Sequence, residues 1–375
     1  MKIIDNSVVF SGRKGTDFQS CVFPQICILP TGRWLCTFRL APTKSATTGQ
    51  RPAIIFSDDQ GKSWSEPTIP FKPEAVDDKP GLFRSAALTW LKSNKLIAVI
   101  CWVDHSDPSL PFFNEQTEGL LDTRIFLASS EDMGKTWSKP QLIDTSPFNV
   151  PTPITGPVLE LPNGCLACQF ELNKHYYDTS PWRHNSVIMF SSNEGKIWPE
   201  HVLTSEDPEN KIFYWDQRPG LLADGSILDL FWTYNTKQAI YLNIHARSSK
   251  DNGRTWSDMW DTGVPGQPAT AVSLADGTIA MVYVDRTGPP TIKMRISSDG
   301  GKTWPGDSEI AIHSSASKSQ TWSKKTMDDA WAEMGAFSIG LPATTQLPNG
   351  DILVVYYAGQ TTDETSIWGA RIRNH

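Results

Sequence analysis

The residues of this sequence that could do chemistry are carboxylates, arginines and large aromatic side chains in its longer connecting segments. Two carboxyl groups can cleave a glycosidic bond, because one protonates the leaving oxygen while the other acts as base or nucleophile. A histidine and a tyrosine can instead act as base and acid in an elimination. The candidate catalytic residues are Asp104, Glu171, Asp216, His175 and Tyr357.

The same segments hold residue types that suit the binding of an acidic sugar. Arginine binds carboxylates bidentately, and aromatic faces stack on pyranose rings. Any one of these residues could be an ordinary loop residue, but their density favours a carbohydrate site. The candidate substrate-binding residues are Arg39, Arg51, Arg84, Arg218, Arg286, Tyr176 and Trp215.

The scaffold that must position these residues is revealed by an octapeptide with the pattern Ser-x-Asp-x-Gly-x-Thr-Trp. It occurs five times, as SDDQGKSW (57–64), SEDMGKTW (130–137), SSNEGKIW (191–198), SKDNGRTW (249–256) and SSDGGKTW (297–304). The Asp and Gly predict a tight turn between two strands, and the Asp carboxylate can accept hydrogen bonds from turn amides. Because a turn is needed in every unit and a catalytic residue only once, we interpret these aspartates as structural.

A second repeat alternates with the first. It reads LPTGRWL (29–35), LPNGCLA (161–167), LADGSIL (222–228), LADGTIA (274–280) and LPNGDIL (347–353), with a weaker copy, KSNKLIA (92–98). Each copy predicts a hairpin turn followed by a strand. Six such turns indicate six units, near 18–75, 80–145, 150–205, 212–262, 265–312 and 335–375. The last unit ends before an octapeptide, so the N-terminal VVFSG (8–12) is expected to supply its outer strand and close the ring.

These octapeptides resemble the Asp boxes, or BNR repeats, of the sialidase superfamily, and the resemblance covers nearly the whole chain. It implies an all-β fold, a six-bladed β-propeller of four-stranded antiparallel blades, with residues 1–375 as a single domain. The superfamily includes sialidases, other glycosidases and proteins without enzymatic activity.

Two sialidase features are replaced in this sequence. Sialidases carry a Phe/Tyr-Arg-Ile-Pro segment in the first blade, and the corresponding stretch here is CVFP (21–24), with Val22 at the arginine position. Arg84, in FRSA (83–86) of the next blade, is the candidate substitute. Sialidases also use a tyrosine nucleophile early in the last blade. Residues 338–350 contain no tyrosine, and Tyr356 and Tyr357 follow on the next strand.

Strand order predicts the face on which a site must lie. In a four-stranded antiparallel blade, the turn after the first strand and the turn after the third strand lie at the same end. Both repeated turns therefore share one face. The opposite face carries the starts of the innermost strands and the loops between second and third strands, which vary from blade to blade and include Glu333 ahead of the last blade. Variable loops on a repeat scaffold usually carry function.

Several function classes are disfavoured by the sequence. The net charge of -7 argues against nucleic acid as a partner. No phosphate-binding glycine loop and no HExxH motif occur, so we expect no cofactor and no catalytic metal. The six cysteines lie mostly in strand-like apolar runs and are expected to be buried free thiols. Neither an N-terminal signal peptide nor a membrane span is visible, which predicts a cytoplasmic protein.

The favoured hypothesis is an exo-acting glycoside hydrolase, sialidase-like, that acts on a terminal and anionic sugar of an oligosaccharide or glycoconjugate. One alternative is a lyase for uronate sugars, with His175 and Tyr176 as base and acid. The other is a glycan-binding propeller without catalysis. The sequence leaves the sugar, the linkage, the stereochemical course and the oligomeric state open.

Overall fold

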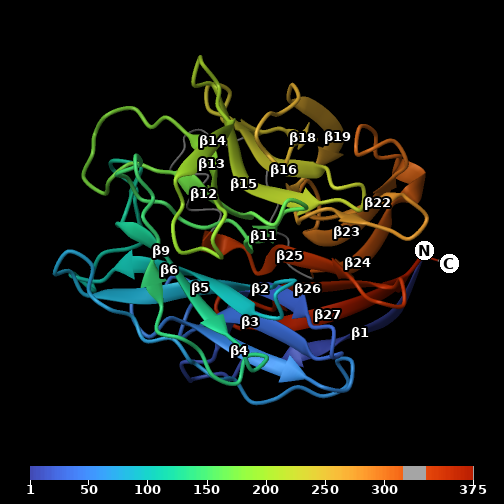
Figure 1. Ribbon diagram of the computed structural model, residues 1–375, viewed down its shortest axis with the longest axis horizontal. Coiled ribbons are helices and arrows are strands. Elements are labelled where there is room, and N and C mark those ends of the chain that lie inside the picture. Colours follow the sequence, from blue (N-terminus) through green and yellow to red (C-terminus); the bar gives the residue numbers. More distant parts are fainter. Residues whose placement is uncertain (316–334, 375) are drawn as a thin grey trace.

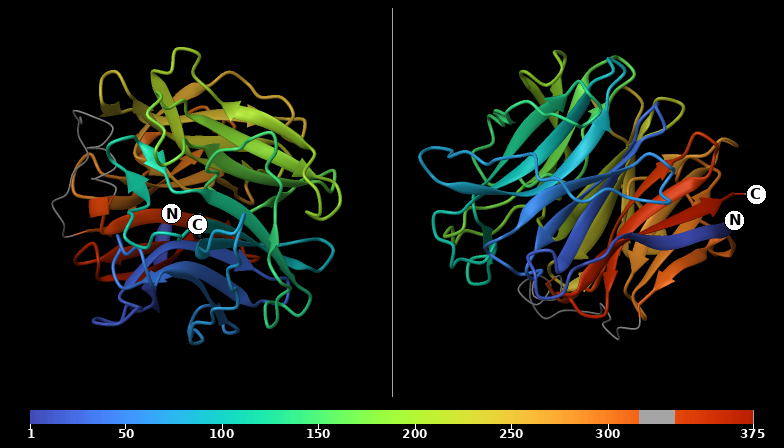
Figure 2. Two further views of the ribbon diagram at one scale, coloured as in Figure 1. Left: turned by 90° about the vertical axis from the view of Figure 1, so that its left-hand side faces the viewer. Right: turned by 90° about the horizontal axis from the view of Figure 1, so that it is seen from below.

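Six antiparallel sheets succeed one another along the chain and form a six-bladed β-propeller (Figures 1 and 2). The computed structural model describes residues 1–315 and 335–374. The predicted fold class is therefore confirmed, although the blades hold between three and five strands rather than four each. Glu333 lies outside the described residues.

The strands of the first three blades follow the order of the chain. Blade 1 has β2 (Ser20–Ile28), β3 (Trp34–Ala41) and β4 (Arg51–Ser57); blade 2 has β5 (Gly81–Trp90), β6 (Leu96–Asp104), β9 (Thr123–Ser130) and β10 (Gln141–Leu142); blade 3 has β11 (Leu159–Glu160), β12 (Leu166–Leu172), β13 (Asn185–Ser191) and β14 (Glu200–Ser205). A small hairpin, β7 (Phe113–Asn114) with β8 (Gly119–Leu120), lies in the β6–β9 loop of blade 2.

The second half of the ring repeats this arrangement. Blade 4 has β15 (Ile212–Leu221), β16 (Ile227–Asn235), β17 (Ile240–Tyr241), β18 (Asn243–Ser249) and β19 (Trp260–Pro265); blade 5 has β20 (Gln267–Pro268), β21 (Val272–Ser273), β22 (Ile279–Asp285), β23 (Thr291–Ser297) and β24 (Ile310–Ser314), with the 3-10 turn η1 (Gly306–Ser308); blade 6 has β25 (Ile339–Gln346), β26 (Ile352–Gly359) and β27 (Thr365–Arg373).

The N-terminal strand closes the ring. Strand β1 (Lys2–Phe10) pairs antiparallel with β27, from Lys2 opposite Arg373 to Phe10 opposite Ile367. The two termini consequently lie side by side (Figures 1 and 2). This confirms the predicted closure, with a strand that begins six residues earlier than VVFSG. Asp351 supports the joint, because its carboxylate binds Arg371 at 2.6 Å and Arg373 at 3.0 Å.

The second strand of a blade is buried on both faces, because each sheet packs between two neighbouring sheets. All eight residues of β3 and all seven of β22 are buried. This explains why these strands are near-continuous apolar runs and do not alternate between apolar and polar residues.

The same burial accounts for the environment of the cysteines. All six are free, and Cys165 alone is partly exposed.

The repeated octapeptides form the same hydrogen-bonded turn in each copy. In blade 2, Asp132 Oδ1 accepts from the Thr136 N–H at 2.8 Å and from the Ser130 hydroxyl at 2.8 Å, while Oδ2 accepts from the Thr136 hydroxyl. Gly134 adopts φ of +85°, which favours glycine. The blade 3 copy has Asn193 instead, and its Oδ1 still accepts from Ser191 and from the N–H of Ile197. The octapeptide aspartates therefore bind their own turns.

Substitution of Asp132 by alanine is expected to lower the melting temperature by a few degrees, because three hydrogen bonds of the turn are lost. Asp132→Asn is the matched control. It should lower the melting temperature less, since Asn193 shows that an amide fits this turn. Differential scanning fluorimetry measures both. Ligand affinity of the folded variants should be unchanged, and a loss of affinity at unchanged stability would contradict a purely structural role.

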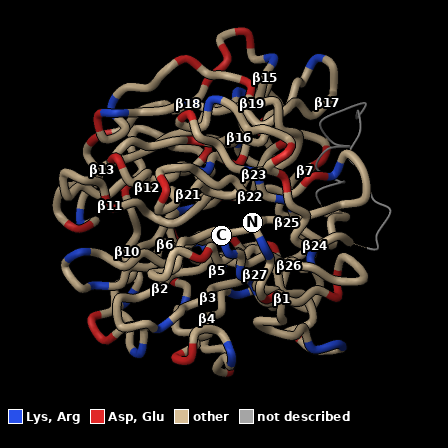
Figure 3. Tube along the Cα trace, turned by 90° about the vertical axis from the view of Figure 1, so that its right-hand side faces the viewer, with Lys and Arg blue, Asp and Glu red and all other residues tan. Residues whose placement is uncertain are grey.

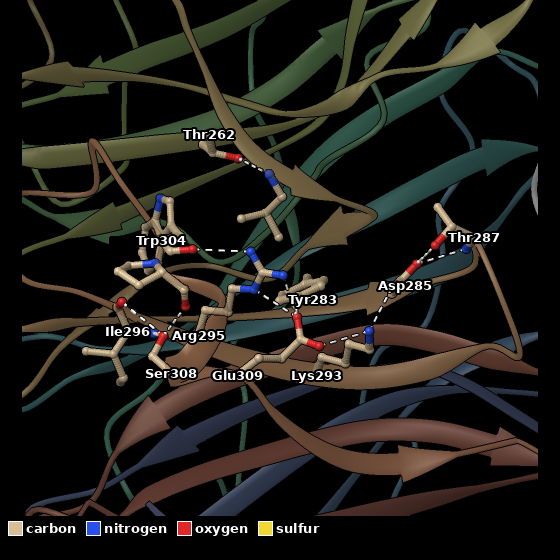
Figure 4. A network of polar contacts seen from close by, with 12 residues as sticks. Thr262, Tyr283, Asp285, Thr287, Lys293, Arg295, Ile296, Trp304, Ser308 and Glu309 are labelled. Carbon is tan, nitrogen blue, oxygen red and sulfur yellow. Dashed lines mark hydrogen bonds and ion pairs between the residues drawn. The ribbon is translucent and has the colours of Figure 1, made fainter.

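Blade 5 is held by a network of charged groups around Glu309 (Figure 4). The Glu309 carboxylate binds Lys293 at 3.0 Å and Arg295 at 2.8 Å, and it accepts a hydrogen bond from the Tyr283 hydroxyl. Lys293 also binds Asp285 at 2.9 Å. Burial alone would raise the pKa of Glu309, but these hydrogen bonds outweigh it and lower the pKa from 4.5 to about 2.

This pKa shift predicts a pH-dependent contribution to stability. Because the folded state lowers the pKa, the contribution is complete above pH 4.5 and is lost as the pH falls toward about 2. Glu309→Gln should therefore lower the urea midpoint at pH 7, and its difference from the parent should shrink as the pH falls. Glu66→Gln, which removes an exposed carboxylate paired with Arg13, should show no such difference. A Glu309→Gln deficit that persists at low pH would contradict this account.

Candidate active site

A cavity of about 620 Å³ lies among the ends of the blades. Its walls come from the starts of innermost strands and from the loops between second and third strands, and none of its described lining residues belongs to a repeated turn. This is the face on which the strand order predicts a site. Half of the twelve candidate residues line the cavity, namely Arg84, Asp104, Asp216, Arg218, Arg286 and Tyr357.

Irregularities in the innermost strands aim side chains into this cavity. The pairing of β2, β5, β15 and β25 with the second strand of each blade shifts register near the cavity. In three of these strands one residue has a left-handed conformation: Phe23 (φ 59°), Asp216 (φ 54°) and Leu341 (φ 43°). All three line the cavity. Such bulges re-aim a side chain that regular alternation would direct elsewhere, and the unfavourable φ persists because the surrounding structure enforces it.

Asp216 is the carboxyl group most tightly built into the site. Its Oδ1 lies 2.5 Å from Arg218 Nη2, its Oδ2 accepts from Gln267 Nε2 at 2.7 Å, and its backbone N–H donates to Glu171 Oε1. Burial raises the pKa of Asp216; the nearby Arg218 opposes this shift and the Glu171 carboxylate adds to it. A carboxyl group with a raised pKa is suited to donate a proton.

Gln217 anchors the bulge from behind. Its side chain is fully buried and points into the seam between blades 3 and 4. There its Nε2 donates to the carbonyl oxygens of Phe170 (2.9 Å) and Val187 (3.0 Å), and its Oε1 accepts from the Thr204 hydroxyl at 2.9 Å. Asp216 therefore faces the cavity, while the side chain of Gln217 points the other way and is held by contacts with blade 3.

Polar contacts continue from Asp216 around the axis to blade 6. Gln267 Oε1 accepts from Arg286 Nη1 at 2.9 Å, and Arg286 Nη2 donates to the Ile339 carbonyl at 3.0 Å. Gly340 permits this approach, since a Cβ at its position would lie 2.4 Å from Arg286 Nη2. Burial raises the pKa of Tyr357 to about 12, although Arg286 and Arg39 oppose the shift. The Tyr357 hydroxyl lies 3.4 Å from Lys44 Nζ.

Arg84 differs from the other arginines of the cavity wall. Its Nη1 donates to Gln50 Oε1 at 3.0 Å, and its guanidinium lies 4.3 Å from the centroid of the Phe112 ring. Within residues 1–315 and 335–374, no carboxylate lies within ion-pair distance of Arg84. Burial lowers the pKa of Arg84 to about 10. The buried Arg39 lies close enough to be repelled by it. No carboxylate of the described residues therefore compensates the charge of Arg84.

The surroundings of Arg84 contrast with the exterior. Acidic and basic residues are interspersed over the side of the molecule shown in Figure 3, as expected for a chain of net charge -7. Lys44 is also buried nearby; burial, followed by repulsion from Arg286, Arg39 and Arg84, lowers its pKa well below the ordinary value, although Asp363 opposes the shift. An anion in the cavity would relieve this repulsion.

Two candidates support the site from behind the cavity wall. Glu171, on β12, contacts the backbone of Asp216, and its Oε2 lies 3.7 Å from His184 Nε2. Arg39 is fully buried on β3, where its Nη2 donates to the Lys44 carbonyl. Neither is among the described residues that line the cavity. Asp104 lines it but also caps its own loop, accepting from the N–H (2.8 Å) and hydroxyl (2.6 Å) of Ser106.

The remaining four candidates lie away from the described cavity wall. Arg51 binds Asp17 at 3.3 Å. His175 is exposed, and its Nε2 lies 2.9 Å from the Asn149 carbonyl. Tyr176 is buried, and Trp215 stacks on Tyr234 with ring centroids 5.1 Å apart. These positions do not bring His175 and Tyr176 into the cavity as a base and acid pair.

Sequence reasoning missed the amides that organise the charges. Gln50 accepts from both Arg39 and Arg84, and Gln267 joins Asp216 to Arg286. Their positions in the sequence could have indicated them, because Gln267 begins an innermost strand and Gln50 directly precedes β4.

Among the described residues, no group of three or more His, Cys, Asp or Glu side chains could hold a metal ion. The described part also contains no helix of the length and apolarity that a membrane crossing requires.

Comparison with solved structures supports the fold over the whole chain. A protein of unknown function from Dyadobacter fermentans superposes with a TM-score of 0.76 at 19% identity, covering 99% of both chains. The intramolecular trans-sialidase from Ruminococcus gnavus gives 0.65 at 14% identity, covering 98% of this chain and 97% of that one. An alpha-L-arabinanase from Penicillium chrysogenum gives 0.63 at 16% identity, covering 98% of both.

Comparison of the sequence itself gives a narrower result. No curated protein sequence matches this chain. The model of the BNR repeat-like domain matches residues 86–306, which include four of the five octapeptides. Since the match spans more than half of the sequence and the blades carry the repeated turns in structure, this chain belongs to the BNR repeat-like domain family.

Proposed function

We propose that this protein is an exo-acting glycoside hydrolase that releases a terminal anionic sugar. The observation that carries the proposal is Arg84, a cation without a carboxylate partner in the described structure, in the same cavity as Asp216, a carboxyl group with a raised pKa. Arg84 would bind the acidic group of the substrate, and Asp216 would donate a proton to the leaving oxygen. A cavity at the axis of a propeller receives the end of a glycan more readily than its middle.

Tyr357 is the proposed partner of Asp216. Its hydroxyl lies 3.4 Å from Lys44 Nζ. The charges of Arg286 and Arg39 favour the phenolate, while burial keeps the phenol protonated in the resting site. Glu171 holds the backbone of Asp216. The trans-sialidase and the arabinanase that share this fold support a carbohydrate substrate. The anionic character of that substrate rests on Arg84.

The proposal is tested with a panel of 4-nitrophenyl glycosides of sialic acid, glucuronic acid and arabinose, followed by oligosaccharides that end in the preferred sugar. We expect an anionic monosaccharide with the mass of a hydrolysis product, and no turnover of the neutral glycoside. An unsaturated product that absorbs in the ultraviolet would establish a lyase instead. Saturable binding without any product would establish a glycan-binding propeller.

A further inference from the structure

The cavity has two chemically different sides. Its cations and Asp216 come from blades 1, 2, 4 and 5, whereas β5, β6, the β6–β9 loop and the segment before β11 contribute a cluster of apolar side chains, beside the polar Asp104, His105, Glu115 and Thr155. We call this cluster the apolar lobe; it consists of Leu82, Val103, Leu110, Phe112, Leu121 and Ile154. Leu82 and Val103 are buried, and Phe112, Leu121 and Ile154 pack against them.

Most residues of the apolar lobe present apolar surface to the cavity. Leu110, Phe112, Leu121 and Ile154 are only partly buried, and all four line the cavity. Part of their apolar surface is therefore open to the cavity, and exposed apolar surface is unfavourable unless a ligand covers it. The loop is also locally fixed, since the Leu121 N–H donates to the Phe112 carbonyl at 3.0 Å. A fully hydroxylated sugar ring would find no hydrogen-bonding side chain among these six residues.

The cationic side and the apolar lobe meet at Arg84. Its guanidinium lies 4.3 Å from the centroid of the Phe112 ring, while its Nη1 contacts Gln50 on the other side. An acidic group bound by Arg84 is therefore adjacent to the lobe. Charge complementarity places the acidic end of the ligand at Arg84, and the part of the ligand next to that end then contacts the lobe at Phe112.

We infer that the apolar lobe binds an aryl or alkyl group that the ligand carries next to its acidic group. This inference deepens the proposed function by naming the substrate as an amphiphilic anionic glycoside. The recognition itself does not require turnover, because both sides of the site exist in the resting protein. Binding of small probes can therefore test it even if no hydrolysis is found.

Three probes separate the two contributions: acetate carries only the anion, 2-phenylethanol carries only the apolar group, and phenylacetate carries both. Affinities of the full chain are measured by ligand-observed NMR titration. We expect phenylacetate to bind at least about tenfold more tightly than acetate, as burial of a phenyl ring provides. Leu121→Ser should remove most of this advantage and leave acetate affinity unchanged. Arg84→Gln should weaken both carboxylates and leave 2-phenylethanol unaffected.

The matched control is Leu142→Ser, which makes the same change at a leucine that is 48% exposed on the outer strand β10. It should bind all three probes like the parent. Ile154→Thr serves as a second lobe variant if Leu121→Ser does not fold, as judged by thermal melting. Equal affinity for acetate and phenylacetate, or an advantage that survives both lobe substitutions, would overturn the inference. Turnover without that advantage would leave the hydrolase proposal standing and the lobe without a ligand role.

Discussion

Asp216→Asn is expected to lower kcat about 10²- to 10⁴-fold on glycosides with alkyl leaving groups, the range that general acid–base catalysis contributes. An aryl leaving group such as 4-nitrophenolate departs with little need of a proton, so the loss on aryl glycosides should be much smaller. This difference between leaving groups identifies proton donation, because a merely misfolded site would lose both activities equally.

The pH profile gives an independent reading of the same carboxyl group. Burial raises the pKa of Asp216, with a further contribution from Glu171. A proton donor must be protonated, so kcat/KM should fall as the pH rises through that pKa. Asp216→Asn should abolish this alkaline limb. Asp107→Asn, a change on the exposed part of the β6–β9 loop, is the matched control and should leave the profile intact. An alkaline limb that survives Asp216→Asn would exclude Asp216 as the acid.

The parts of the fold that could be predicted are those in which local sequence determines local geometry. A Ser-x-Asp-x-Gly-x-Thr-Trp segment builds its own turn through contacts within eight residues, as Asp132 and Gly134 show. Strand order then fixes the face on which a site lies. Closure by β1 was also predictable, because the last blade lacks an outer strand in sequence while the N-terminus has a spare one.

The site itself could be predicted only in part because bulges interrupt the alternation of side chains. Trp215, Asp216 and Arg218 form one short segment, and sequence reasoning assigned all three to the ligand. The register shift between Trp215 and Arg218 instead sends Trp215 into an aromatic cluster with Tyr234, while Asp216 and Arg218 reach the cavity. A register shift of one residue reverses the face of a side chain, and this shift lies where the Gln217 side chain contacts the neighbouring blade 3.

Long-range partners were the other unpredictable part. Gln217 fixes the bulge through two carbonyl oxygens of blade 3 that lie 47 and 30 residues away. Gln267 joins Asp216 to Arg286 across two blades. Neutral amides carry no charge pattern that sequence inspection can detect, so these contacts emerge only when the ring is assembled.

Arg84→Ala is expected to cost about 2–4 kcal/mol in transition-state binding, that is roughly 30- to 1,000-fold in kcat/KM, without lowering the melting temperature. The loss of kcat/KM and the unchanged melting temperature have the same cause. No described carboxylate compensates Arg84, and burial lowers its pKa to about 10, so the free protein gains nothing from the charge. Its removal should therefore relieve repulsion with Arg39 and leave stability equal or slightly higher.

One further variant separates charge from geometry at this position, and a second serves as a control elsewhere in the molecule. Arg84→Lys keeps the positive charge but loses the planar fork, so it should recover only part of kcat/KM. Arg33→Ala removes an arginine that binds Asp58 at 2.7 Å on the face of the repeated turns, and it should leave kcat/KM unchanged. Steady-state kinetics and thermal melting are measured on all three variants. If the melting temperature of Arg84→Ala falls and activity declines only in proportion to the unfolded fraction, Arg84 is a structural residue and the anion-binding role is wrong.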